Sequence, residues 1–521
     1  MLDKLTGKPV HYTIHYIACL AIAIGLPWSK IPMSIGTLLI FANLILKADF
    51  KSYWDSWKQN TWLKALFAYV VLEWISLIWT HNFEYALADF RIKLPLYALP
   101  LAMVAIPFKT RKTLFSIVLA FLVVLTITSI INFGSYYHWW GNKTYDDIRG
   151  MSLFGSHIRY SLEIVMGIVI CIGWILRKLP FYSFAFVVVV WLIIYTYYSQ
   201  ILSGYIAFSA IILAGLLLII KNFPSKPFKL IILVSFLGLI IGSGFWLYKE
   251  LKPIPHKVNL NELKLHSKKG EAYFFDKNTR WENGYPVLAQ VAEKELEHSW
   301  NSVSSIPYHG GKDIHGNPIH FTLMNYMTSK GLTKDEEGFK QLSKNEIRLI
   351  ESGINSTLVV NGGLKARLHG ISMQLEYSDN PNGHSLLQRL EYWKAAKNIV
   401  ANNWFLGVGS GDIDDTFKQF YKSSHSKLTI ENQHRTHNQF LTSWITSGIF
   451  GFITFILWWL FQLKTALKLK AFEWLCFVFI CCFSFLTEDT IETQMGVTFV
   501  AFFFALFAAN NTLLYRRDNL N

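Results

Sequence analysis

His437 is the residue of this chain best placed to do chemistry. It stands in the stretch Thr436–Leu441, where a long polar segment meets an apolar run. An imidazole is the side chain best suited to moving a proton near neutral pH. A titratable group at the mouth of a membrane segment costs free energy unless it pairs or has a function. We therefore treat His437 as a candidate general base. An interfacial histidine is the competing interpretation, with Asn438 as a possible cap of the next helix.

The polar segment supplies a second group of candidates. Arg389 and Trp393 lie one helical turn apart within Ser385–Trp404, where apolar residues recur at helical spacing. A guanidinium on this helix could hold two phosphate oxygens, although a solvated arginine is the plainer explanation of the spacing alone. Gly409 lies in the glycine-rich stretch 407–412 that ends the helix. Such a stretch either presents backbone N–H groups to an anion or is a plain turn.

Charged residues also lie at the ends of apolar runs. His157 and Arg159 open one run, and an arginine this deep either needs a partner or reaches the interface along its own stem. Glu488, Asp489 and Glu492 fill a short connection near the C-terminus. If this connection is helical, Glu488 and Glu492 face the same way and could orient a histidine or an arginine. A hydrated loop is the competing interpretation.

The composition indicates which elements must hold these residues. The chain has 521 residues, of which 52% are hydrophobic and 16% are charged, whereas soluble domains carry about 25% charged residues. We therefore predict an all-α polytopic membrane protein with about twelve transmembrane helices. The candidate spans are Tyr12–Trp28, Ile31–Leu46, Trp62–Trp79, Leu94–Phe108, Leu114–Phe133, Ile158–Leu176, Phe181–Ser199, Leu202–Ile220, Leu230–Leu247, Phe440–Leu460, Phe472–Leu486 and Val497–Tyr515.

The charges between these runs predict an orientation. Every second connection is basic, from Lys4 and Lys8 before the first span to Arg516 and Arg517 after the last. Because Lys and Arg concentrate in cytoplasmic loops, both termini should be cytoplasmic, and the net charge of +14 does not indicate nucleic-acid binding. We expect a membrane domain at 1–247, a large and mostly helical periplasmic loop domain at 248–436, and a membrane domain at 437–521. The five cysteines all lie in apolar runs, so no cysteine-based metal site is predicted.

Taken together, these motifs resemble the O-antigen ligase family, which is related to O-antigen polymerases and to bacterial O-oligosaccharyltransferases. The resemblance follows the order of an arginine helix (Gln388–Ala396), a glycine turn (Gly407–Gly411) and Thr436–Leu441, and it covers essentially the whole chain. It is most specific from Ser385 to Gly451. The stretches Thr328–Asp335 and His157–Ser161 look like the version found in the Bacteroidetes group.

The resemblance implies a GT-C-like, metal-independent glycosyltransferase in the bacterial inner membrane, with no cofactor. Its donor would be a glycan on undecaprenyl pyrophosphate, and its acceptor a sugar hydroxyl of lipid A–core at the periplasmic face. By motif match His437 is the catalytic histidine and Arg389 the loop arginine, and Glu488 or Asn438 would hold His437. We expect the pyrophosphate and glycan to be bound by residues at the same membrane face: Arg389, Arg159, His157, Trp393, Gly409 and Arg435.

The sequence departs from the family at one position. A further family arginine usually stands in a Ser-Arg-Ser/Thr-Gly motif at the start of a span. The corresponding stretch here reads Gln200-Ile-Leu-Ser-Gly204, without an arginine. Arg159 is the residue that would supply this charge instead.

Other functions remain open at this point. An O-antigen polymerase would transfer the glycan to another lipid-linked unit, and a protein O-oligosaccharyltransferase to a Ser or Thr hydroxyl. The catalytic motifs do not distinguish these acceptors. A transporter with a periplasmic domain would show paired repeats and polar groups at the bilayer midplane. The sequence shows no half-to-half similarity, and its notable polar groups cluster at one face, which favours surface chemistry over transport.

Overall fold

The computed structural model describes most of the chain and divides it into two compact units. The described residues are 10–140, 148–199, 201–222, 225–252, 254–276, 278–314, 316–360, 363–377 and 380–515, so Lys4, Lys8, Gln200, Arg516 and Arg517 lie outside them. One unit, called here the membrane unit, comprises Met1–Ile232 and Pro381–Asn521. The other, called the inserted unit, comprises Leu233–Asn380. The division falls within helix α11 (Lys226–Leu251).

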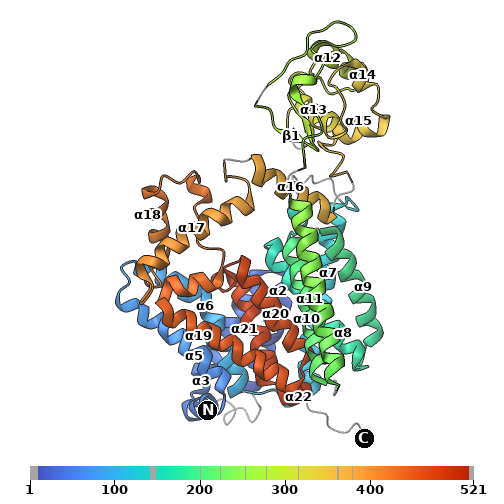
Figure 1. The fold of residues 1–521 in the computed structure, drawn as a ribbon. Coiled ribbons are helices and arrows are strands. Elements are labelled where there is room, and N and C mark those ends of the chain that lie inside the picture. The colour runs from blue at the N-terminus through green and yellow to red at the C-terminus, as the bar shows by residue number, and fades with distance from the viewer. Residues whose placement is uncertain are drawn as a thin grey trace. The chain divides into compact units, whose positions relative to one another are not determined.

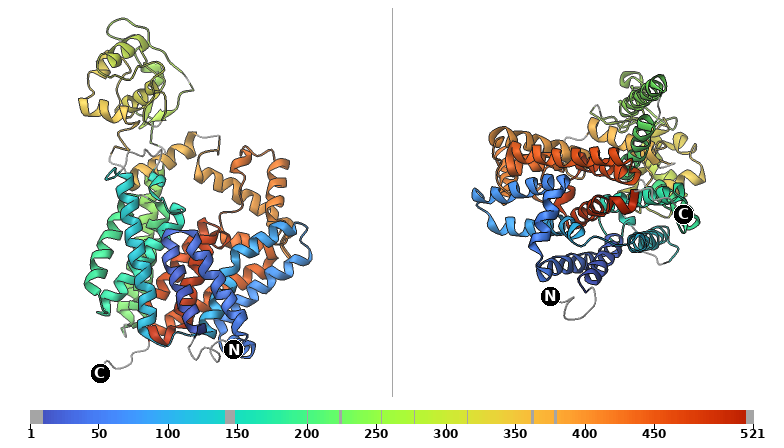
Figure 2. Two further views of the ribbon diagram at one scale, coloured as in Figure 1. Left: turned by 180° about the vertical axis from the view of Figure 1, so that it is seen from behind. Right: turned by 90° about the horizontal axis from the view of Figure 1, so that it is seen from below.

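The membrane unit is helical throughout its described part (Figures 1 and 2). Before the inserted unit its helices are α2 (Val10–Trp28), α3 (Lys30–Lys47), α4 (Phe50–Gln59), α5 (Thr61–Ile75), α6 (Phe83–Ala105), α7 (Arg111–Tyr136), α8 (His157–Leu176), α9 (Tyr182–Ser199) and α10 (Leu202–Asn222). After it come α17 (Ser385–Asn403), α18 (Ile413–Ser423), α19 (Gln439–Leu469), α20 (Phe472–Thr487), α21 (Gln494–Ala509) and α22 (Asn511–Tyr515). The short 3₁₀ turns are η1 (Ser76–Ile78), η2 (Ile148–Met151), η4 (Ile430–Asn432) and η5 (Thr490–Glu492).

Eight helices of the described residues are long and apolar enough to cross a membrane. They are α2, α3, α5 with η1, α7, α8, α9, α10 and α19, and the shorter apolar helices α20 and α21 accompany them. The chain is therefore a multi-pass membrane protein, while the count of twelve spans stays a prediction. The span expected from Leu94 lies within a longer helix, α6, which already begins at Phe83. The charged residues Asp89 and Lys93 interrupt the apolar run but pair with each other inside the helix.

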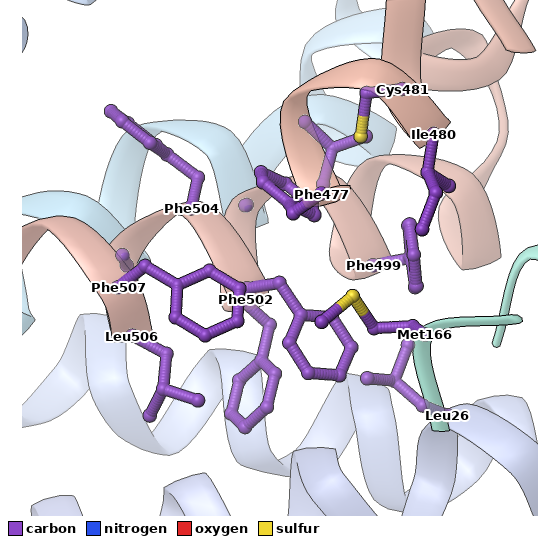
Figure 3. Close-up of a cluster of buried hydrophobic side chains, with 14 of the residues drawn as sticks. Leu26, Met166, Phe477, Ile480, Cys481, Phe499, Phe502, Phe504, Leu506 and Phe507 are labelled. Carbon is purple, nitrogen blue, oxygen red and sulfur yellow. The ribbon is translucent and has the colours of Figure 1, made fainter. Parts of the chain in front are cut away.

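Aromatic side chains fill the core of the membrane unit. Phe499 of α21 and Phe477 of α20 are buried, and they gather with Met166 of α8 and Leu26 of α2 in one cluster (Figure 3). Inside a bilayer such a cluster is stabilised by close van der Waals packing, because lipid tails are as apolar as the side chains. The core thus packs α8, α20 and α21 against one another.

Helix α19 is broken where a continuous span was expected. Ser447 and Gly448 have non-helical backbone angles, and φ of Gly448 is 64°. A break frees backbone groups that need new partners within a membrane. The segment that follows α17 supplies them. The N–H of Val408 donates to Ile445 O at 2.7 Å, and the N–H of Ile449 donates to Trp404 O at 2.9 Å.

Helices α17 and α18 lie together at one end of the membrane unit, where α19 begins (Figure 1). Tyr392 and Ile399 of α17 pack with Phe417 and Tyr421 of α18 in a small core of their own. Although the sequence analysis assigned these helices to the loop domain, they cluster with the membrane unit. Arg389 is therefore fixed to the helices that carry His437.

The inserted unit has its own core and small helices. Its elements are η3 (Leu260–Glu262), β1 (Trp281–Glu282), β2 (Tyr285–Pro286), α12 (Glu293–Asn301), α13 (Ile319–Ser329), α14 (Glu336–Phe339), α15 (Lys344–Glu351) and α16 (Gly363–Tyr377). Strands β1 and β2 form an antiparallel hairpin that the sequence analysis did not predict. Helices α14 and α15 are separate, because Ser343 caps α15 through a capping box with Glu346.

Candidate active site

Glu488 is the centre of a cluster of charges at the end of the membrane unit where α17 lies. Its Oε2 lies 2.7 Å from Nη1 of Arg159 and 3.3 Å from Nδ1 of His437. Its Oε1 lies 2.5 Å from Nη2 of Arg389. Glu488 follows α20, Arg159 lies in the first turn of α8, Arg389 lies on α17, and His437 precedes α19. Four segments far apart in the sequence therefore meet at one carboxylate, of which only 1% is exposed.

The surroundings of Glu488 fix its charge and the tautomer of His437. Burial by itself raises the pKa of this carboxyl, but the hydrogen bond with His437 and the charges of Arg159 and Arg389 outweigh it. They lower the pKa to about 2. An ionised carboxylate can only accept hydrogen bonds. The Nδ1 of His437 must therefore be the donor in this contact, and in the neutral ring Nε2 carries the free lone pair.

The backbone of His437 is held in an uncommon conformation. Its φ is 46°, in the left-handed region that costs a non-glycine residue of the order of 1–2 kcal/mol. Asp489 stabilises the turn, since its Oδ2 accepts the N–H of His437 at 3.0 Å and its Oδ1 accepts the N–H of Asn438 at 3.0 Å. The ring of Tyr392 stacks on the imidazole with centroids 5.3 Å apart. The imidazole is thus fixed from its backbone and from one face of its ring.

Asn438 serves the helix rather than the imidazole. Its Oδ1 accepts the N–H of Leu441 at 3.1 Å as the N-cap of α19. Its Nδ2 donates to Leu486 O at 3.0 Å. Asn438 was a candidate for both a catalytic role and a capping role, and these contacts are those of a cap.

The two arginines carry more positive charge than Glu488 neutralises. Arg389 donates from Nε to Thr487 O at 3.2 Å and from Nη1 to Ser385 O at 3.2 Å, so its guanidinium is held in one orientation. The Nε of Arg159 is buried and has no hydrogen-bond partner among the described residues, and the same holds for Nε1 of Trp393. Unsatisfied buried donors beside surplus positive charge are suited to an anionic ligand with several oxygens.

The start of α10 lies beside this cluster. The hydroxyl of Ser203 is 3.0 Å from the hydroxyl of Ser161, which follows Arg159 on α8. Ser203 belongs to the stretch in which the family arginine is missing. Arg159 therefore lies close to the segment where that arginine was expected. His157, the first residue of α8, is two positions before Arg159.

A second charge cluster lies among the helices and was missed by the sequence analysis. The ammonium of Lys93 is 2.9 Å from Glu73, 2.9 Å from Asp89 and 3.2 Å from Glu492. Lys93 and Glu73 are each only 1% exposed. Intramembrane charges of this kind are costly unless they pair. A search for ionisable residues inside the predicted spans would have found Glu73 in Trp62–Trp79, whereas Asp89 and Lys93 precede the span predicted from Leu94.

Arg435 and Glu492 belong to this second cluster. Nη1 of Arg435 is 3.4 Å from Oε2 of Glu492, and Nε2 of Gln439 donates to Oε1 of Glu492 at 2.9 Å. The expectation that Glu488 and Glu492 face the same way is wrong. Glu488 is extended, with φ −149° and ψ 148°, and η5 is only three residues long. Glu488 therefore contacts His437 itself, whereas Glu492 contacts Arg435 and Gln439 on either side of it.

The glycine turn has a packing role instead of an open backbone cradle. The N–H of Gly409 donates to Thr446 O at 3.0 Å, and that of Ser410 donates to the hydroxyl of Ser76 at 3.0 Å. A Cβ on Gly409 would lie 2.5 Å from Oγ1 of Thr80. The expectation that Gly409 offers its N–H to an anion is therefore not met. Glycine is required here because the turn closes against η1, Thr80 and the break of α19.

One comparison with known protein families covers the helices around His437. Residues 353–456 match the family described as O-antigen ligase. This part of the chain belongs to the O-antigen ligase family. No curated protein matches the chain.

The O-antigen ligase domain contains only part of the cluster around Glu488. Residues 353–456 include α17, α18 and the first half of α19, and with them Arg389 and His437. Arg159 and Glu488 lie outside the matched residues. The membrane helices before and after the ligase domain therefore supply the carboxylate and one of the arginines.

Proposed function

We propose that this protein is a membrane glycosyltransferase of the O-antigen ligase type, with His437 as its general base. It moves a glycan from undecaprenyl pyrophosphate to a hydroxyl of lipid A–core at the periplasmic face of the inner membrane. The observation that carries this proposal is the contact of one ionised carboxylate, Glu488, with both the histidine and two arginines. It brings a base and an anion site together.

The proton transfer follows from the tautomer of His437. Since Nδ1–H donates to Glu488, Nε2 accepts the proton of the acceptor hydroxyl. The hydroxyl oxygen forms a bond to the anomeric carbon, and the bond from that carbon to the pyrophosphate oxygen breaks. Glu488 then stabilises the imidazolium. Attack from the side opposite the leaving group inverts the anomeric centre.

The leaving group is already good, because negative charge on the lipid pyrophosphate is spread over several oxygens. Arg159 and Arg389 bind these oxygens, and positioned charges in a partly dry site stabilise the charge that develops on them. The unsatisfied Nε of Arg159 supports this assignment. His157 and Trp393 complete the glycan and pyrophosphate site, while Arg435 supports it from the Lys93 cluster.

The test is transfer of a lipid-linked glycan in vitro by the purified full chain to lipid A–core, to a second lipid-linked glycan, or to a protein acceptor. We expect transfer to lipid A–core, and a loss of roughly 10²–10⁴-fold in His437→Ala with unchanged donor binding. His425→Ala, which alters an exposed histidine after α18, is the matched control. Full activity of His437→Ala at normal membrane levels would remove the base assignment. Transfer to another acceptor alone would make the protein a polymerase or an oligosaccharyltransferase.

A further inference from the structure

A hollow whose described lining consists of lysines and leucines lies between the ends of α10 and α19. Its volume is about 500 Å³, and its lining residues are Lys221, Leu460, Leu463, Lys464, Leu467 and Lys468. Lys221 ends α10 and the other five lie near the end of α19. This side of the helices carries the basic connections, so it is separate from the His437 site at the opposite end of α19. A hollow of this size is large enough for a small-molecule group.

The charges around the hollow favour an anion. The ammonium of Lys221 donates to the carbonyl oxygen of Leu467, which fixes Lys221 at the mouth. Lys464 and Lys468 are exposed, and they follow one another by one helical turn on the same face of α19. Three like charges this close repel one another, and an anion placed among them removes the repulsion. Among the described residues that line the hollow there is no carboxylate that could do so.

The apolar part of the lining indicates that the anion carries hydrocarbon chains. Leu460 is 51% exposed, and a stripe of exposed apolar side chains leads away from it along α19. This stripe consists of Leu457, Ile453 and Phe450, which recur at helical spacing towards the middle of the span. A soluble phosphate would gain nothing from this stripe, whereas acyl chains would lie along it.

We propose that this hollow is a binding site for an anionic phospholipid of the leaflet that faces the basic connections. The phosphodiester lies among Lys221, Lys464 and Lys468, and the acyl chains follow α19 from Leu460. Basic pockets between membrane helices on the cytoplasmic side bind acidic lipid head groups in this way. The occupant fastens the end of α10 to the end of α19, two helices that the sequence separates by the whole inserted unit.

The experiment measures lipids retained by the purified full chain after detergent exchange in mixtures of phosphatidylcholine and phosphatidylglycerol. Wild type should retain phosphatidylglycerol in preference to phosphatidylcholine. A lysine near an anionic lipid surface contributes about fivefold in affinity (about 1 kcal/mol). The variant Lys221→Gln/Lys464→Gln/Lys468→Gln should therefore lose at least about fivefold in retained phosphatidylglycerol. Its Lys→Arg counterpart should keep the lipid, because the charge remains.

The matched control removes the same charge elsewhere on this side of the protein. Lys51, Lys112 and Lys178 are exposed and do not line the hollow. Their triple glutamine variant should retain phosphatidylglycerol like wild type. Equal loss in this control, or no loss in the first variant, would overturn the proposal. So would displacement of the lipid by inorganic phosphate or glycerol 3-phosphate at matched ionic strength, since the site would then bind soluble phosphates.

Discussion

The carboxylate of Glu488 accepts the Nδ1–H of His437 at 3.3 Å while two arginines hold its negative charge. This contact makes His437 a base rather than a donor at Nε2, and it depends on an acid that remains ionised.

Replacing Glu488 by glutamine should abolish most of the transfer activity. A neutral amide can donate to Nδ1 and so favour the other tautomer of His437, and it leaves Arg159 and Arg389 with less negative charge. We expect transfer from the lipid-linked glycan to fall by roughly 10²–10⁴-fold. Glu431→Gln, in an exposed turn, is the control and should behave as wild type. Nearly normal transfer by Glu488→Gln would show that His437 needs no acid to orient it.

The same carboxylate should make stability depend on acid pH. The pKa of Glu488 is lowered from 4.5 to about 2 in the folded protein. A lowered folded-state pKa contributes stability that is complete above the unfolded value and lost as pH falls through the folded one. The thermal stability of wild type relative to Glu488→Gln should therefore be constant above about pH 4.5 and decline from there towards pH 2. A difference that changed mainly near neutral pH would contradict this origin.

Arg389→Lys should weaken the anion site although the charge is kept. The guanidinium of Arg389 binds Glu488 and two backbone carbonyls at once, and an ammonium cannot reproduce this planar set. We expect the KM for the lipid-linked donor to rise by roughly tenfold or more, with a smaller change in kcat. Arg348→Lys, at an exposed position of the inserted unit, provides the comparison. An unchanged KM for the donor would exclude Arg389 from the pyrophosphate site.

Lys93→Met should destabilise the protein strongly. The substitution leaves Glu73, Asp89 and Glu492 buried without their shared cation. Removing one partner of a buried ion pair costs about 3–5 kcal/mol. Unfolding in detergent should show this loss, and adding Glu492→Gln should recover part of it. Lys394→Met, at an exposed position of α17, is the control. A fully additive double variant would show that Lys93 and Glu492 do not interact.

Gly448→Ala should disturb the break of α19. A Cβ there would lie 1.9 Å from Phe405 O, and φ of 64° is strained for alanine. We expect a loss of stability above about 1 kcal/mol together with reduced transfer, because the break is tied to the segment before α18. Gly215→Ala, where a Cβ would meet nothing within 4 Å, should be neutral or slightly stabilising. Normal thermal unfolding of Gly448→Ala would mean that the break has room to relax.

The sequence predicted which residues belong to the site, but it did not predict the contacts between them. His437, Arg159 and Glu488 were candidates because each is a charged or titratable group beside an apolar run. Arg389 was a candidate because it lies on a predicted helix of the polar segment. Their common contact was not predictable, since it joins segments separated by more than three hundred residues. Spacing also left open which way a side chain points. Asn438 therefore remained both a candidate catalytic residue and a cap.

The structure adds elements that hydropathy conceals. Lys93 was overlooked because it lies just before the apolar run predicted from Leu94. Two of its partners, Glu73 and Glu492, belong to other elements. The break at Ser447 and Gly448 lies inside an otherwise regular apolar run, which looks like an ordinary span. The stop between α14 and α15 depends on a local cap at Ser343. Tertiary contact and local capping, rather than composition, decide these features.

The break in α19 has a consequence for where the chain can change in length. The break divides one helix into two helical segments. The hydrogen bonds from Val408, Gly409 and Ile449 fix the register of one segment against the other. One residue inserted into the first segment would rotate its start by about 100° about the axis. His437 would then turn away from Glu488. We expect surface loops of the inserted unit to tolerate a gain or loss of residues, because this register does not depend on their length. The chain segment from Trp404 to Ile449 should keep its length.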